Sequence, residues 1–160
     1  MRRQLSKSEI KELGNALQIA LEKKDHIEEE DGSLLINGEH AFFSHDGRWL
    51  PFLGFAQSHS LLKEVVVDMG AVKFVSNGAD VMRPGIVSVS DGILAGDAVR
   101  VIDLKNHVTL AIGITLFSGP EILTMVGGKA VRTVHHVGDR RWQLSRENNS
   151  LMSSKKGKDL

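Results

Sequence analysis

The sequence predicts an α+β protein in which a small N-terminal α+β domain precedes a closed or nearly closed β-barrel. Three observations predict it. Apolar residues recur at helical spacing near the N-terminus, Asp-Gly and Asn-Gly dipeptides then separate short β-like runs, and from Glu64 onward the chain is β-rich and punctuated by glycine. Short strands at this spacing are typical of small barrels. We therefore predict domains at residues 1–62 and 63–146, followed by a loose, disordered polar tail at 147–160.

The N-terminal domain is predicted to begin with a helix over residues 6–24. Its apolar positions form one stripe, which consists of Ile10, Leu13, Leu17 and Leu21. Ser6 to Glu9 fits the S-x-x-E pattern, in which the hydroxyl and the carboxylate satisfy amides at the start of a helix. The period then changes, and we predict three short strands at His26–Glu30, Ser33–Ile36 and His40–Ser44. Asp31-Gly32 and Asn37-Gly38 lie between these strands and tolerate the positive φ of tight hairpin turns.

The second domain is predicted to consist mainly of short strands. Three consecutive valines within Glu64–Asp68 are typical of a buried strand. Further strands are predicted at Ala79–Met82, Ile86–Ser90, Ala98–Leu104, Val108–Phe117 and Ala130–Val137. Helical turns are expected at Gly70–Ser76, where Asn77-Gly78 stops the helix, and after Ser118.

Composition excludes several classes of protein. Hydrophobic residues are 41% and charged residues 25%, which is ordinary for a globular domain. Cysteine is absent, which excludes disulfides, thiolate nucleophiles, iron–sulfur clusters and cysteine-based zinc sites. No apolar run approaches the roughly 20 residues that span a bilayer, and the N-terminus does not resemble a signal peptide, so we expect a cytoplasmic protein. Residues 61–160 hold 13 Lys and Arg against 10 Asp and Glu, a mild excess that favours a polyanionic partner.

Motifs of catalysis are absent from the sequence. It contains no P-loop, no G-x-G-x-x-G, no H-E-x-x-H and no G-x-S-x-G. His135 and His136 are adjacent, but neighbours on a strand point to opposite faces and do not easily share a metal ion. Asp68 and Asp80 lie at a strand end and beside glycine, where Asp is a common turn residue. We therefore predict that the protein is not an enzyme and holds neither a metal nor a cofactor.

A glycine-rich pattern in the second domain is more informative. Residues 68–85 read D-M-G-A-V-K-F-V-S-N-G-A-D-V-M-R-P-G, and residues 96–99 read G-D-A-V. Further on come Ile112-Gly113 and the segment 128–131, which reads G-K-A-V. Together these segments resemble the core motif of the PUA domain, named for pseudouridine synthases and archaeosine transglycosylases. The resemblance covers most of residues 64–143 and implies a β-pseudobarrel that binds RNA.

Two further features narrow the resemblance. The G-A-V-K-F-V run in residues 70–75 and the H-H-V-G-D-R-R-W run in residues 135–142 are similar to the family of the T-cell-malignancy-amplified protein and the N-terminal part of ligatin. Residues 41–53 resemble that family's pre-PUA domain, although Phe52 replaces a Thr and the N-terminal region is shorter. Eukaryotic members of this family act on the small ribosomal subunit in initiation, reinitiation and recycling. The free-standing form resembles an archaeal relative.

The resemblance also implies an RNA-binding surface on the short helix, the loop after it and the last strand. Glycine and alanine there let a sugar-phosphate strand approach the backbone, exposed amides at the start of the helix accept phosphate, and Lys and Arg contact phosphates. The residues that match are Gly70, Ala71, Lys73, Asn77, Gly78, Ala79, Arg83, Lys129 and Arg132, and Arg140 and Arg141 extend the basic strip. The glycines are equally expected on the grounds of barrel turns alone. Phe74, Met82 and Trp142 are predicted to lie in the core.

Three functions remain open at this point. The leading hypothesis is a non-catalytic protein of the translation machinery that binds structured RNA, either tRNA or small-subunit rRNA. The second is an adaptor that docks a translation factor or ribosomal protein on an exposed apolar patch of the N-terminal domain, formed by Phe42, Phe43, Trp49, Pro51 and Phe52. The third is a specificity subunit of an RNA-modifying enzyme, because a chain of 160 residues leaves no room for a catalytic domain of its own.

Overall fold

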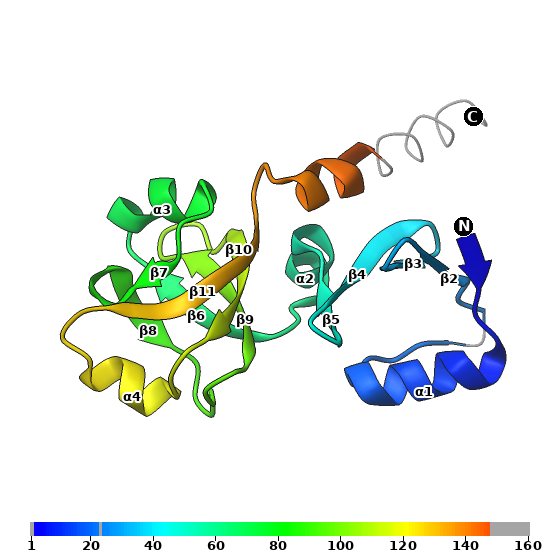
Figure 1. Ribbon diagram of the computed structural model, residues 1–160, viewed down its shortest axis with the longest axis horizontal. Coiled ribbons are helices and arrows are strands. Elements are labelled where there is room, and N and C mark those ends of the chain that lie inside the picture. The colour runs from blue at the N-terminus through cyan, green and yellow to red at the C-terminus, as the bar shows by residue number, and fades with distance from the viewer. Residues whose placement is uncertain (1, 23, 148–160) are drawn as a thin grey trace. The chain divides into compact units, whose positions relative to one another are not determined.

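The computed structural model describes residues 2–22 and 24–147, and the chain divides into two compact units (Figure 1). The first unit consists of the described residues up to Pro51 together with residues 144–147, and the second unit is Phe52–Gln143. We predicted a boundary between residues 62 and 63, whereas the structure assigns residues 52–62 to the second unit. Apart from Glu147, the predicted polar tail lies outside the described residues.

The first unit is an antiparallel meander with one helix. Its sheet has the order β1-β2-β3-β4-β5, formed by β1 (Arg2–Gln4), β2 (Ile27–Glu30), β3 (Ser33–Ile36), β4 (Glu39–His45) and β5 (Arg48–Pro51). The three predicted strands are confirmed as β2, β3 and β4, and β1 and β5 add the two edges. Asp31 and Gly32 have φ of 49° and 78°, and Asn37 and Gly38 have φ of 51° and 83°. These values are typical of the tight hairpin turns that the dipeptides predict.

Helix α1 (Lys7–Leu17) begins where the sequence predicts and ends earlier. The Ser6 hydroxyl accepts a hydrogen bond from the Glu9 amide at 3.2 Å, as expected of an N-cap. Gln18 then adopts a left-handed conformation with φ of 54°, and the Ile19 amide donates to the Gly14 carbonyl at 3.1 Å. This C-terminal cap closes the helix at Leu17, so the predicted end at residue 24 is wrong.

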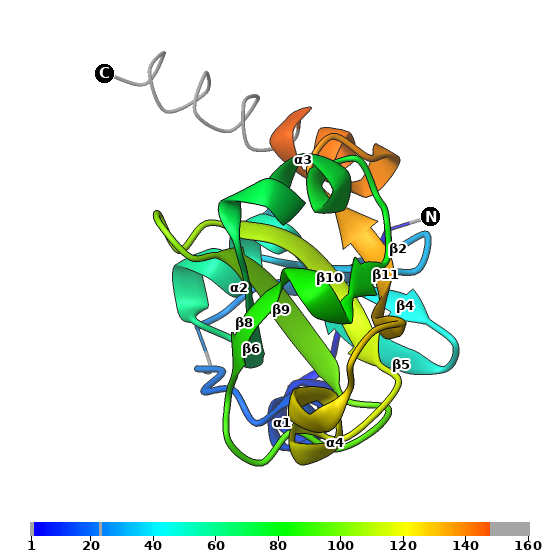
Figure 2. The same cartoon turned by 90° about the vertical axis from the view of Figure 1, so that its left-hand side faces the viewer.

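The second unit is a nearly closed six-stranded pseudobarrel, which confirms the predicted fold class. Its sheet has the order β7-β11-β10-β9-β6-β8, formed by β6 (Lys63–Val67), β7 (Val81–Met82), β8 (Ile86–Val89), β9 (Ala98–Asp103), β10 (Thr109–Thr115) and β11 (Lys129–His136). Neighbouring strands are antiparallel except β6 and β9, which are parallel. The remaining elements are α2 (Leu53–His59), α3 (Met69–Ser76), the 3₁₀ turn η1 (Arg83–Gly85) and α4 (Gly119–Thr124). Helices α3 and α4 lie at opposite ends of the barrel (Figures 1 and 2).

One hydrophobic core holds the pseudobarrel together. Val65 and Val67 on β6 are fully buried, and Val75 of α3 and Ile122 of α4 join the same cluster. The two short helices are therefore anchored by single apolar side chains that point into the barrel, while their other residues remain available to solvent. None of the helices in the described part of the chain is long and apolar enough to cross a membrane.

Candidate nucleic-acid interface

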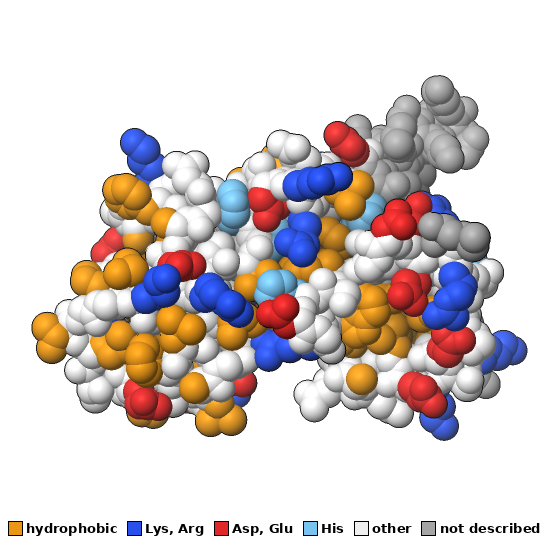
Figure 3. Space-filling model, in the orientation of Figure 1, with side chains coloured by type: hydrophobic (Ala, Val, Ile, Leu, Met, Phe, Trp, Pro, Cys, Tyr) orange, Lys and Arg blue, Asp and Glu red, His pale blue; other side chains and the backbone are white. Residues whose placement is uncertain are grey.

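The predicted RNA-binding residues come from one stretch of chain and the strand that pairs with it. Helix α3 leads through Gly78 into β7 and then η1, and β7 pairs with β11. The Arg83 amide donates to the Gly128 carbonyl at 2.8 Å, and the Thr133 hydroxyl donates to the Ala79 carbonyl at 2.9 Å. These bonds bring the loop after α3, η1 and β11 together. In Figure 3, Lys and Arg side chains lie over β11 and hydrophobic side chains gather over α3 and α4.

One face of α3 is exposed along its whole length. We call it the outer face of α3, and it consists of Gly70, Lys73, Phe74 and Asn77. These positions follow the i, i+3, i+4, i+7 spacing of one helix face, opposite the side that buries Val75. The Phe74 side chain is 64% exposed, so its predicted place in the core is wrong.

The other apolar residues predicted for the core have different environments. Met82 is 48% exposed, because it follows the buried Val81 on a strand of two residues and points the other way. Trp142 is partly buried. The prediction that Met82 lies in the core is therefore wrong.

Cations on β11 surround Asp80. The Lys129 ammonium lies 2.8 Å from one Asp80 carboxylate oxygen, and the Thr133 amide donates to the other at 2.9 Å. Burial acts to raise the pKa of Asp80, but these hydrogen bonds and the charges of Lys129 and Arg132 outweigh it and hold the pKa below its ordinary value. Arg132 is exposed and, among the described residues, makes neither a hydrogen bond nor an ion pair. Arg132 is thus more available to an external anion than Lys129.

The other predicted arginines differ in their availability. One terminal nitrogen of Arg83 donates to the Ile86 carbonyl at 3.0 Å, so this partly buried side chain is held against its own backbone. Arg140 is exposed and Arg141 is partly buried at the start of the helical residues 140–147. The structure therefore offers Arg140, rather than Arg83, as a solvent-facing arginine.

The glycines of this surface are not equivalent. A Cβ at Gly78, where φ is +93°, would lie 2.7 Å from Nε2 of His136, and a Cβ at Gly85 would lie 3.0 Å from the Ala71 methyl group. The chain's own side chains therefore occupy the space beside these two glycines, where the close approach of RNA was expected at Gly78. Gly70 is exposed, and a Cβ there would meet only the Asp68 carboxylate, at 3.3 Å. Gly70 is the position at which another chain can come close to the backbone.

The start of α3 carries a carboxylate where we expected a phosphate. Asp68 is the N-cap, and its side chain accepts a hydrogen bond from the Ala71 amide at 2.9 Å. A negative charge at this position stabilises the helix and repels a second anion. The expectation that phosphate binds the first amides of α3 is therefore corrected.

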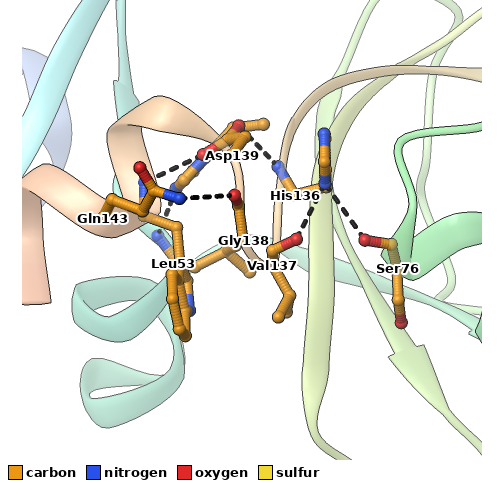
Figure 4. A network of polar contacts seen from close by, with 9 residues as sticks. Leu53, Ser76, His136, Val137, Gly138, Asp139 and Gln143 are labelled. Carbon is orange, nitrogen blue, oxygen red and sulfur yellow. Dashed lines mark hydrogen bonds and ion pairs between the residues drawn. The ribbon is translucent and has the colours of Figure 1, made fainter.

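The two adjacent histidines have separate roles (Figure 4). Nδ1 of His136 lies 3.1 Å from the Ser76 carbonyl and 2.9 Å from the Val137 carbonyl. Because both partners are acceptors, Nδ1 carries the proton and Nε2 faces Gly78. His135 is fully buried, and its Nε2 accepts the Leu53 amide hydrogen at 3.1 Å. Its Nδ1 therefore carries the proton and donates to the Asp139 carboxylate at 2.9 Å.

Asp139 and His135 perturb each other's titration. Burial acts to raise the pKa of Asp139, but hydrogen bonds from His135 and from the Trp142 and His136 amides outweigh it and lower the pKa to about 2. Burial lowers the pKa of His135 below its ordinary value, and the neighbouring Asp139 only partly opposes this. This cluster fastens the start of α2 to the end of β11, and the sequence offered no signal for it beyond an unusual pair of histidines. No group of three His, Asp or Glu in residues 2–22 and 24–147 could hold a metal ion.

The apolar patch predicted for the N-terminal domain is not exposed. Phe42 and Phe43 are 4% and 2% exposed on β4, which pairs with β3 and β5 on its two sides. Pro51 is buried, Trp49 is partly buried, and Phe52 is buried in the second unit with its ring edge-on to His135. The predicted exposure is wrong because a central strand and the start of the barrel absorb these side chains.

Comparisons with known proteins identify the family. The PUA domain model matches residues 63–137. An uncharacterized protein of Methanocaldococcus jannaschii is 35% identical over 88% of this chain and 94% of its own length. Malignant T-cell-amplified sequence 1 homolog of Drosophila melanogaster is 35% identical, with 74% of this chain and 66% of the relative covered. Translation machinery-associated protein 20 of Eremothecium gossypii is 33% identical, with 69% and 65% covered. This chain spans about two thirds of the length of these two eukaryotic relatives.

A solved structure agrees with the sequence relatives. The PUA domain protein of Aeropyrum pernix, crystallised as a tartrate complex, has a TM-score of 0.82 to this chain at 27% identity, with 92% of each chain covered. The resemblance inferred from the glycine pattern is confirmed. This chain belongs to the PUA-domain family that includes Malignant T-cell-amplified sequence 1 and Translation machinery-associated protein 20.

Proposed function

We propose that this protein is a non-catalytic RNA-binding protein of the translation machinery, acting in the cytoplasm on structured RNA, either tRNA or small-subunit rRNA. The observation that carries the proposal is the basic surface on the family's RNA-binding domain, where Lys73 and Arg132 are exposed. The names of the eukaryotic relatives point to translation. Asp80 engages Lys129 and a backbone carbonyl engages Arg83, so Lys73, Arg132 and Arg140 are the phosphate contacts that the geometry favours.

The chemistry of this surface fits recognition by shape. An A-form duplex hides its major groove from side chains and presents phosphates and 2′-hydroxyls along a wide minor groove. Separate cations on a helix and on a strand can contact such a backbone without reading its sequence. We therefore expect affinity to fall steeply with salt, because each phosphate that Lys or Arg neutralises releases counterions.

Charge reversal with a salt titration tests the proposal. The Lys73→Glu, Arg132→Glu double variant should bind a labelled tRNA or small-subunit rRNA fragment about tenfold more weakly at fixed salt. The slope of log affinity against log salt should become shallower by about 0.7–0.9 for each phosphate that the variant no longer neutralises. The control is Lys63→Glu, which makes a single charge reversal at the opposite end of β6 from α3, where Nζ contacts the Gly92 carbonyl at 2.9 Å. Circular dichroism establishes that every variant is folded.

The outcome also separates RNA binding from the adaptor role. A wild-type affinity that does not change with salt, or a double variant that binds as the control does, contradicts the proposal. Capture of a translation factor that survives nuclease treatment, from a protein without measurable RNA affinity, would favour the adaptor instead.

A further inference from the structure

The outer face of α3 combines residue types that do not belong together on an ordinary solvent-facing helix. Phe74 is 64% exposed between Lys73 and the buried Val75, and the face also presents Gly70 and Asn77. We propose that this face binds one unpaired nucleotide of the RNA, with the base stacked on the Phe74 ring. The proposal rests on the proposed function and adds to it the class of RNA, a structured RNA with an unpaired nucleotide.

The geometry of the helix makes room for a base. Residues four apart lie on the same face, and a helical side chain leans toward the turn that precedes it. The Phe74 ring therefore leans toward Gly70, which has no side chain of its own. A Cβ at Gly70 would meet nothing but the Asp68 carboxylate within 4 Å, so the ledge beside the ring is open. A planar base can lie there against an apolar ring face.

The two polar residues of the face supply the rest of a nucleotide site. Lys73 precedes Phe74, and its ammonium makes no hydrogen bond or ion pair with the described residues. Asn77 lies one turn after Phe74, and its side-chain amide is likewise without a partner in the described part of the chain. An ammonium suits the phosphate, and an amide can both donate to and accept from a base edge.

Charge favours a nucleotide over an apolar protein segment. Lys73 is the charged residue of this face, Arg132 on β11 adds a second exposed cation to the same domain, and the Asp68 carboxylate is engaged by the Ala71 amide. An aromatic ring beside cations is the arrangement that proteins use for unpaired bases, whose faces are free, whereas bases within a duplex are already stacked. Each stacked base contributes about 1–3 kcal/mol by alanine substitution, which is a change in affinity of about 5- to 150-fold.

Two hairpins that differ by one nucleotide test the proposal. One is a blunt RNA hairpin, and the other is the same hairpin with a single unpaired purine at its 3′ end. The wild-type protein should bind the second at least about fivefold more tightly. Phe74→Ala should remove this difference while leaving the affinity for the blunt hairpin unchanged. Phe74→Tyr keeps a ring and should retain the difference, whereas Phe74→Leu keeps an apolar side chain without a ring and should lose it.

A matched control and the contrary outcomes complete the design. Leu123→Ala, at a 51% exposed position on α4, should bind both hairpins as the wild type does. If the wild type binds both hairpins equally and with a steep salt dependence, stacking is excluded while the proposed function stands. If the wild type binds neither hairpin, both fail. If Phe74→Leu retains the preference, or Phe74→Ala loses a protein partner and no RNA affinity, the outer face of α3 is an apolar docking surface and the proposal is overturned.

Discussion

Two regions of the second unit differ in where their polar and aromatic groups find partners. In the His135 cluster, formed by Leu53, His135 and Asp139, both ring nitrogens of His135 and both carboxylate oxygens of Asp139 bond within the chain. On the outer face of α3 the ammonium of Lys73, the amide of Asn77 and the ring of Phe74 have no such partners among the described residues. Groups satisfied by the chain itself maintain the fold, and groups that the chain leaves unsatisfied are available to a ligand.

The largest expected effect comes from removing the buried ring. His135→Ala should lower the free energy of unfolding by about 3 kcal/mol or more, because it creates a cavity and leaves the Leu53 amide and the Asp139 carboxylate without a partner. Urea unfolding measures the change. RNA affinity of the folded variant should stay at the wild-type value. His26→Ala, at a largely exposed histidine that contacts Glu28, is the control and should lose at most about 1 kcal/mol.

Acid should weaken the same cluster in a defined range of pH. The pKa of Asp139 is about 2 in the folded protein and 3.8 ordinarily, so the unfolded chain takes up its proton first as the pH falls. Stability from this group is therefore complete above pH 4 and declines toward pH 2, by about 2 kcal/mol in total. The lowered pKa of His135 adds a loss that begins as the pH falls through its ordinary value of 6.5. Urea unfolding at pH 7, 5, 4 and 3 measures the decline. Asp139→Asn should flatten the part below pH 4, and parallel curves for the two proteins would contradict this assignment.

Gly78 lies where the loop after α3 meets His136, and it tests whether the fold or the ligand requires glycine. Gly78→Ala should lower the free energy of unfolding by about 2 kcal/mol, because φ is +93° and the new methyl group would press on the His136 ring. That ring cannot yield easily, since two carbonyls hold its Nδ1. Gly127→Ala, with open space around it, is the control in the same urea measurement. A stable Gly78→Ala protein with weakened RNA binding would instead assign this glycine to the ligand.

How far the sequence predicts the structure differs between local and long-range features. The hairpins around Asp31-Gly32 and Asn37-Gly38 are confirmed because the turn residues themselves set φ. The edge strands β1 and β5 were missed, since short strands of three or four residues carry no clear alternation and depend on pairing with distant partners. The barrel was predictable from strand spacing and family resemblance, whereas the parallel pairing of β6 with β9 is a long-range contact that no local pattern encodes.

The candidate site shows the same limit. Lys73 and Asn77 are predicted by the family pattern, and both are exposed. Phe74 is expected in the core because an aromatic residue in an apolar helix is usually buried, but only one side of a two-turn helix can face the barrel, and Val75 takes it. Phe42 and Phe43 show the opposite error, because both are expected in an exposed patch and the structure buries both on a central strand. Which strand becomes central depends on pairing between distant segments, and no local pattern reports it.

The smallest effect is expected at Asp68, which belongs to both sides of the comparison, because it caps α3 and also places a negative charge at its start. Asp68→Asn keeps a side-chain oxygen for the Ala71 amide, so the free energy of unfolding should change by only a few tenths of a kcal/mol. Removal of the charge should raise RNA affinity by about twofold to threefold and steepen the salt dependence, because a repulsion with phosphate near Gly70 is removed. Asp68→Ala should show the same rise in affinity together with a drop of about 1 kcal/mol in stability, because the cap is gone. An affinity that does not respond to either substitution would mean that the RNA backbone does not pass the start of α3, and that phosphates are held by the β11 side of the domain instead.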